Sequence, residues 1–439
     1  MRRIFIAIIG LISYSVAQAQ TAYSLKQLAD SLIENSFQLR INRLQEEEAR
    51  LQTGMAAAGA YPTVSLQAGN SQAFNNTRQE FFNGDIREAS LAANQAWNAA
   101  VRADWTFFNG FRVWAQSAIN ETRHQLSSLI TRARMEEELF QLASLYAELQ
   151  AREQMLQNLK STLSVSNENY RLAESRQRIG KANKQDVLQS LTNLNSDSSN
   201  YIKEENRILY LKLELKKLCG LKSGGMIQVG DTTNETAVPA LDKLIENALA
   251  QNTDIRQQKA QVLISLKNEK LQKADRYPQL GLFAEYNFVQ SANQVGILKS
   301  NTSLGPAFGL SFRYTLFDGF RVSRNISLAA LQTKQSRLNE EQTSFELRIS
   351  MAQAYDTYLL NRRLSELERQ NSLLAEENLS LAQARLNNGV ISAFDFRQVQ
   401  ESTLAAESRA IEANYELRRS ALQLMLWSGD LLKAIYPAP

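Results

Sequence analysis

The sequence contains an internal duplication. Residues 108–113 read Phe-Asn-Gly-Phe-Arg-Val, and residues 317–322, 209 positions later, read Phe-Asp-Gly-Phe-Arg-Val. The same offset relates further pairs without an insertion, among them Gly180 and Gly389, Asp186 and Asp395, and Gln189 and Gln398. Because the same sequence unit occurs twice in tandem, the chain is expected to fold into two equivalent halves.

Glycine and proline positions predict long helices in both halves. No proline lies between residues 63 and 238 or between 307 and 436. After each repeated motif, one glycine interrupts about 110 residues rich in helix formers, namely Gly180 in the first half and Gly389 in the second. We therefore predict two helical hairpins, each opening with a helix roughly 100 Å long that ends where the glycine adopts a positive φ.

The resulting domain organisation has two repeats and a linker. The first repeat covers 20–219, the linker or equatorial region 220–239, the second repeat 240–429 and a C-terminal tail 430–439. In chain order the predicted elements are a helix at about 24–60, a β-hairpin at about 62–108, a helical hairpin at 111–219, a helix at about 241–276, a β-hairpin at about 278–317 and a helical hairpin at 320–428.

Heptad spacing in the long helices predicts left-handed coiled-coil packing. Two series of residues are each spaced by alternating steps of three and four. The first heptad series is Leu142, Leu145, Leu149, Arg152, Leu156, Leu159, Leu163, Ser166 and Tyr170. The second heptad series is Leu360, Leu364, Leu367, Asn371, Leu374, Asn378, Leu381 and Arg385. The acidic run 136–138 is predicted to be a solvated helix face.

The hairpin segments alternate with a period of two, apolar against polar, as transmembrane β-strands do. The alternative is a pair of amphipathic hairpins packed on a soluble core. Alternating apolar positions include Val64, Leu66, Val101, Ala103, Leu282, Ala284, Phe308 and Leu310. Four strands cannot close a barrel, and an open edge is not tolerated in lipid. Two copies of the chain would give eight strands filled by side chains, and three would give twelve strands with a lumen.

Residues 1–19 are predicted to be a secretory signal peptide, because two arginines precede a short apolar run and an Ala-Gln-Ala cleavage site. No cysteine follows that run, so a lipid anchor there is not expected, and no apolar run is long enough for a transmembrane helix.

The single cysteine, Cys219, and the single histidine, His124, argue against metal clusters and His-based catalysis. The net charge of +4 gives no support for nucleic-acid binding. We predict no enzymatic activity, cofactor or metal.

The chain resembles the TolC family of outer-membrane efflux and secretion channels over essentially its whole mature length. The resemblance rests on the duplicated helix–hairpin–helix plan, the Tyr-Pro at 61–62 and 277–278, the Phe-Asn/Asp-Gly-Phe motifs, and a glycine-to-aspartate turn in each half. It implies a mainly α-helical fold with a β-barrel in the membrane. The barrel is trimeric and has 12 strands, four from each protomer, and a coiled-coil α-helical barrel continues it. It also implies an outer-membrane location with a periplasmic helical tunnel, and partnership with an adaptor, an inner-membrane transporter and outer-membrane lipid.

By the same resemblance the helix–helix turns form a periplasmic tip. We name them the first tip turn (180–186) and the second tip turn (389–395). Their aspartates, Asp186 and Asp395, match the family's pore entrance. Each could cap its returning helix, line the pore, or do both. The chain departs from the pattern where some members carry a second aspartate or an arginine, at positions occupied here by Gln189, Gln398 and Ile391.

The two tip turns differ in chemistry, and adaptor docking is expected at both. The first tip turn carries Gly180, Lys181 and Lys184, so it is basic. The second begins at Gly389 and is apolar, and its Val390, Ile391 and Phe394 are expected to be exposed. The predicted function is a passive trimeric exit duct of a tripartite efflux or type I secretion system. The alternative is a non-conducting trimeric coiled-coil structural or adhesion protein of the cell envelope.

Overall fold

The computed structural model describes residues 22–221, 227–230 and 238–436. The predicted signal peptide, parts of the linker and the last three residues of the tail lie outside the described residues. The chain forms two compact units. Unit 1 combines 1–43, 129–256 and 342–439, and unit 2 combines 44–128 and 257–341. Each unit draws on both repeats.

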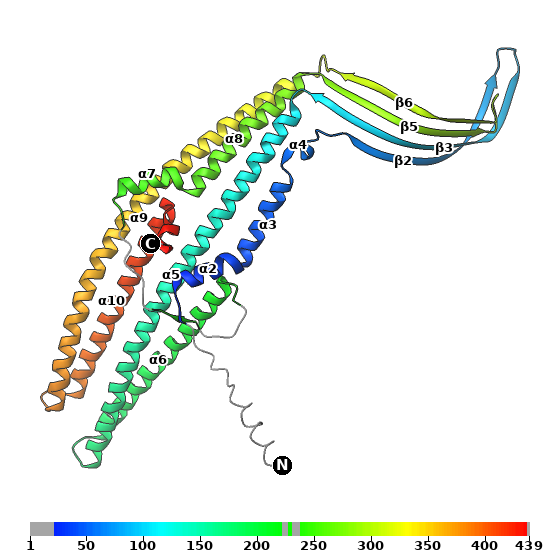
Figure 1. Cartoon of the computed structure of the whole chain (residues 1–439). Coiled ribbons are helices and arrows are strands. Elements are labelled where there is room, and N and C mark those ends of the chain that lie inside the picture. Colours follow the sequence, from blue (N-terminus) through cyan, green and yellow to red (C-terminus); the bar gives the residue numbers. More distant parts are fainter. Residues whose placement is uncertain (1–21, 222–226, 231–237, 437–439) are drawn as a thin grey trace, which may run out of the picture. The chain divides into compact units, whose positions relative to one another are not determined.

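Unit 2 contains a four-stranded antiparallel sheet (Figure 1). Its strands, in spatial order, are β2 (Thr63–Glu80), β3 (Ile86–Asn109), β5 (Gln279–Asn293) and β6 (Ser300–Arg313). The strands lie within the predicted hairpins at about 62–108 and 278–317, apart from the last residue of β3, which has 24 residues. One hairpin comes from each repeat, and β3 and β5 join them at the centre of the sheet.

The strand register makes the sheet amphipathic. Leu66 lies opposite Val101, Val101 opposite Tyr286, and Leu282 opposite Leu310. Cross-strand neighbours share a face, so the apolar alternation of the four strands falls on one side. The opposite side carries polar positions such as Arg102, which lies opposite Glu285.

The repeated Phe-Asn/Asp-Gly-Phe motif forms the corner between a hairpin and the following helix. At the first corner both Gly110 (φ 68°) and Phe111 (φ 69°) are left-handed, and Gly319 and Phe320 repeat this at the second. A Cβ on Gly110 would come within 2.3 Å of the Ala274 carbonyl oxygen, so no larger residue fits. The Asn109 and Asp318 side chains accept the backbone N–H four residues on, at 3.3 and 2.9 Å, and so start the helices.

Each repeat continues with a long helical hairpin (Figure 1). In the first repeat α5 (Arg112–Arg178) is followed by α6 (Lys184–Leu218), and in the second α9 (Arg321–Asn387) is followed by α10 (Ala393–Ser428). Both α5 and α9 have 67 residues, close to the length predicted from the glycine positions. No helix in the described part of the chain is both long and apolar enough to cross a membrane.

The helix predicted at about 24–60 is broken. It consists of α2 (Leu25–Asn35), α3 (Phe37–Leu51) and the short α4 (Gly54–Ala57). Ser36 has ψ 125°, which ends one helix, and its hydroxyl accepts the Leu39 N–H at 3.4 Å, which starts the next. The single-helix prediction was therefore wrong at Ser36.

The equivalent segment of the second repeat breaks at the matching position. It consists of α7 (Leu241–Gln251), α8 (Thr253–Lys273) and the 3-10 turn η1 (Ala274–Arg276). Asn252 has ψ 129°, and its side-chain oxygen accepts the N–H groups of Asp254 and Ile255. Ser and Asn compete for backbone hydrogen bonds in this way, so both favour caps over helix interiors.

Both breaks contact carboxylates of α5, which corrects a second prediction. The Ser36 hydroxyl donates to Glu138 at 2.6 Å, and the Thr253 hydroxyl donates to Glu136 at 3.3 Å. Glu136 and Glu138 are buried rather than solvated. Burial is tolerated because each carboxylate accepts a hydrogen bond, and Arg132 also pairs with Glu136.

The main core of unit 1 forms around α5. Leu142, Tyr146 and Leu149 pack there with α2, α6 and the C-terminal α11 (Leu431–Ile435). Beside this core, the two-residue strands β1 (Ala22–Tyr23) and β4 (Gln228–Val229) pair in parallel. A smaller core joins α7, α9 and α10 around Met351. The described parts of the tail and the linker, such as Leu431 and Ile227, thus pack on unit 1 through apolar burial.

Candidate functional site

The first tip turn ends α5 with a Schellman motif. Gly180 has φ 76°, its N–H donates to the Gln177 carbonyl at 3.0 Å, and the Lys181 N–H donates to the Arg176 carbonyl at 2.8 Å. Gly180 has open space around its missing side chain, so backbone conformation alone requires glycine there. Lys181 and Lys184 are exposed.

The second tip turn repeats this geometry at the end of α9. Gly389 has φ 73° and donates to the Leu386 carbonyl at 3.0 Å, while the Val390 N–H donates to the Arg385 carbonyl at 2.9 Å. The positive φ predicted for both glycines is confirmed. The duplication therefore reproduces the turn backbone even though the side chains differ.

Both tip aspartates occupy the third helical position of a capping box. Asn183 caps α6: its side chain accepts the Asp186 N–H at 2.9 Å, and Asp186 accepts the Asn183 N–H at 3.1 Å. Ser392 caps α10 in the same way, and its hydroxyl also donates to Asp395 at 2.7 Å. That hydroxyl and the Ser392 N–H hold the pKa of the Asp395 carboxyl below its usual value.

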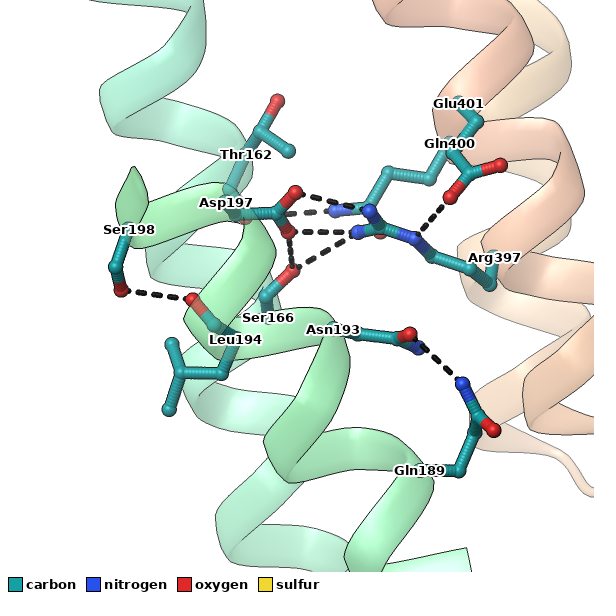
Figure 2. Close-up of polar contacts among 10 residues, drawn as sticks. All are labelled: Thr162, Ser166, Gln189, Asn193, Leu194, Asp197, Ser198, Arg397, Gln400 and Glu401. Atoms are coloured by element: carbon teal, nitrogen blue, oxygen red, sulfur yellow. Dashed lines mark hydrogen bonds and ion pairs between the residues drawn. The ribbon is translucent and has the colours of Figure 1, made fainter. Parts of the chain in front are cut away.

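The structure thus gives both aspartates a capping role and leaves their carboxylates exposed. Their assignment to a pore entrance stays a prediction. Gln189 and Gln398 are exposed one turn further along each returning helix, and Gln189 donates to Asn193 of its own helix at 3.0 Å (Figure 2). Within the described residues Asp186 forms no ion pair with the neighbouring Lys181 and Lys184.

The apolar residues of the second tip turn divide into two kinds. Val390 is 63% exposed and Phe394 is 76% exposed. Ile391 is partly buried, because it packs against the cluster of Ala382, Leu386 and Phe396. The expectation that all three were exposed was therefore wrong for Ile391.

A buried ion pair lies behind the tip turns, and the sequence reasoning missed it (Figure 2). Arg397 of α10 donates two hydrogen bonds to Asp197 of α6, Nη1 to Oδ2 at 2.6 Å and Nη2 to Oδ1 at 2.9 Å. Ser166 of α5 donates to the same carboxylate at 2.6 Å, and Gln400 accepts from Arg397 at 3.1 Å. Asp197 is 2% exposed. Asp197 therefore raises the pKa of the Arg397 guanidinium.

This cluster joins the two helical hairpins near their turns. A bidentate Arg–carboxylate pair fixes orientation as well as distance, and removing one partner would leave a buried charge unpaired. Two sequence signals could have found it: Ser166 is a polar member of the first heptad series, and Arg397 follows Asp395 by two residues. Neither signal identifies Asp197, because the pairing of α6 with α10 depends on the tertiary fold.

Clusters suited to metal binding are lacking in the described ranges. No group of three or more His, Cys, Asp or Glu side chains there could hold a metal ion. Cys219 is buried, and burial raises the pKa of its thiol to about 12, so the reactive thiolate is disfavoured. The arrangement around the tip turns consists of caps, exposed apolar side chains and one buried ion pair.

Comparison with known proteins identifies relatives along most of the sequence. The profile of the family described as "Outer membrane efflux protein" matches residues 28–221 and 244–430. The cation efflux system protein CusC of Escherichia coli O157:H7 is 21% identical over 423 residues, which cover 91% of this chain and 84% of CusC. The outer membrane protein OprJ of Pseudomonas aeruginosa is 27% identical over 228 residues, covering 50% of this chain and 46% of OprJ.

Solved structures share the fold at low sequence identity. The CmeC outer membrane channel of Campylobacter jejuni superimposes with a TM-score of 0.76 at 16% identity, covering 93% of this chain and 86% of CmeC. A crystal structure of CusC gives a TM-score of 0.74 at 18% identity, with 92% of both chains covered. These likenesses confirm the predicted fold class for one chain, a mainly helical protein with four antiparallel strands.

Proposed function

The chain belongs to the outer membrane efflux protein family, and from that premise we propose that it is a passive homotrimeric exit duct of a tripartite efflux or type I secretion system. It resides in the outer membrane, and its helices project into the periplasm. The observation that carries the proposal is the amphipathic four-stranded sheet, whose apolar face spans both repeats.

The outer edges of the sheet support oligomerisation. Within the described residues, β2 and β6 each pair on one side only. Unpaired backbone groups of a sheet edge cannot be satisfied in lipid, so β6 of one subunit is expected to pair with β2 of the next. Three copies give twelve strands and a lumen, whereas two give eight strands filled by side chains.

The helices supply a second argument for assembly. Leucines of the second heptad series lie exposed along α9, for example Leu367 (52%) and Leu374 (66%). A solvent-facing apolar stripe of this length marks a contact surface, and heptad spacing suits another helix. We assign this stripe to the neighbouring subunit of the trimer.

The tip turns provide the entrance and the docking surface of the duct. Asp186 and Asp395 are exposed at the turns, so six carboxylates of a trimer would favour cations at the entrance. Exposed Val390 and Phe394 offer an apolar contact to a periplasmic adaptor, and through it to an inner-membrane transporter. The Arg397–Asp197 pair keeps the two hairpins of a subunit together behind these contacts.

Conductance in planar lipid bilayers tests the channel. Purified protein is expected to form discrete ion-conducting pores, which a structural or adhesion protein would not form. Leu310→Arg, on the apolar face, is expected to destabilise the assembled protein by about 2–4 kcal/mol at mid-membrane. Ser311→Arg, on the polar face, is the matched control and should retain pores. Equal loss in both variants would count against a lipid-facing apolar side.

Export assays in cells test the docking surface. Phe394→Glu is expected to abolish export by removing the apolar contact, while the purified protein still conducts in bilayers. Phe394→Tyr keeps the ring and should export normally. Ile391 is unsuitable for this test, because a charge there would also disturb the packed cluster around Phe396. Normal export by Phe394→Glu at normal outer-membrane levels would refute this docking site.

A further inference from the structure

The polar face of the sheet carries an ordered ion network centred on Arg102 of β3. Arg102 Nη1 donates to Oε2 of Glu285, the residue directly opposite on β5, at 3.0 Å. Its Nε donates to Oδ2 of Asp104, two residues along the same strand face, at 2.8 Å. Both repeats therefore contribute to one cluster at the centre of the sheet.

An aromatic ring supports the guanidinium group. The Arg102 guanidinium lies 4.8 Å from the centre of the Phe283 ring, within the range of a cation–π contact. The ring in turn lies over Gly309 of β6, where a Cβ would come within 2.7 Å of it. Glycine at this position makes room for the ring, so the charges are held in place rather than carried on a free side chain.

The network has an excess of negative charge. Each subunit places one guanidinium and two carboxylates there, and side-chain exposure is 36% for Arg102, 20% for Glu285 and 48% for Asp104. All three are on the face opposite Leu66, Leu282 and Leu310. In a closed barrel whose apolar face meets lipid, that face lines the lumen.

We propose that Arg102, Asp104 and Glu285 form a charge filter inside the barrel, which favours cationic over anionic solutes. This inference rests on the proposed trimeric channel. Three copies give a ring with a surplus of three negative charges, and charges lining a narrow aqueous path raise the local concentration of ions of opposite sign. The filter is separate in sequence and in structural unit from the tip aspartates.

Reversal potentials in a KCl gradient across planar bilayers measure the filter. Glu285→Gln removes three negative charges from the ring and should lower the K⁺/Cl⁻ permeability ratio by about twofold at 0.1 M salt. Arg102→Gln removes three positive charges and should raise the ratio by about the same factor. Changes of opposite sign in the permeability ratio identify an effect of charge, because distortion of the barrel would change the ratio in the same direction in both variants.

Two further variants complete the test. Glu285→Asp keeps the charge and should keep the wild-type ratio. Asp104→Asn removes a charge at the most exposed of the three residues and should also lower the K⁺/Cl⁻ permeability ratio. This variant keeps the proposal testable if a substitution at Arg102 or Glu285 prevents assembly. The proposed filter would be refuted if the conducting variants kept the wild-type permeability ratio, or if Glu285→Gln and Arg102→Gln changed it in the same direction. Absence of any wild-type conductance would instead refute the proposed channel.

Discussion

The helices α5 and α9 are equal in length and occupy equivalent places in the duplication, but their two heptad series differ in burial. Leu142 and Leu149 of the first heptad series are fully buried in the subunit. Leu367, Leu374 and Leu381 of the second series are 52–66% exposed. The two series do not occupy matching positions: at the offset of 209 Leu142 matches Met351, which is also fully buried, so both copies keep this core position while the leucines of the second series lie exposed further along α9.

The cause of the difference is visible around each helix. The core around α5 receives side chains from α2, α6 and the C-terminal α11. The core beside α9 is smaller and centres on Met351, so the leucine stripe lies outside it. Leucines of the first series thus stabilise the subunit, whereas those of the second are left for assembly, which the following changes test.

The largest effect is expected in the α5 core. Leu149→Ala should lower the free energy of unfolding by about 3 kcal/mol, because it removes a fully buried side chain and leaves a cavity. Leu367→Ala in α9 should cost the isolated subunit much less, since half of that side chain is already in water. Denaturant titrations of both variants in detergent provide the measurement. Similar losses at the two sites would mean that the helices do not differ in role.

Substitutions in the leucine stripe of α9 should instead weaken the trimer. Leu374→Glu places a carboxylate in the proposed subunit contact and should raise the dissociation constant of the trimer at least about tenfold. Leu374→Met preserves apolar volume and serves as the control. Light scattering reports the oligomer and circular dichroism the helix content. A trimer of wild-type stability in Leu374→Glu would place the subunit contact elsewhere.

The smallest effects are expected at the two helix caps. Asn183→Ala and Ser392→Ala should each lower stability by about 1 kcal/mol, because each removes a capping side chain. The two values are expected to be similar, since the turn backbones are alike although the exposed side chains are not. Thermal unfolding compares them, and a large difference would show that the turns are not equivalent.

The second cap should also depend on pH. Its Ser392 hydrogen bonds lower the pKa of Asp395 from the usual 3.8. A lowered folded-state pKa gives stability that is present above the unfolded pKa and is lost as pH falls through the folded value. Local protection of the α10 start, followed by hydrogen exchange, should therefore fall below about pH 4. Asp395→Asn should remove that component of the pH dependence; an unchanged profile would argue against the carboxylate as its source.

The sequence by itself determined the features that depend on short stretches of backbone. Gly180 and Gly389 end the long helices because only glycine takes a positive φ without steric cost. The alternation around Val101 and Leu282 identified the strands, because successive side chains of a strand point to opposite faces. The duplication then predicted two equivalent halves and, with the tip-turn motifs, the family.

The tertiary structure alone decided which polar groups are buried and which apolar groups are left exposed. The acidic run containing Glu136 and Glu138 looks solvated in sequence, but the helix breaks at Ser36 and Asn252 bring hydroxyl donors onto it. The pairing of Arg397 with Asp197 joins residues 200 positions apart. Burial is a property of the elements that meet in space, and helix periodicity does not specify which neighbour covers each face.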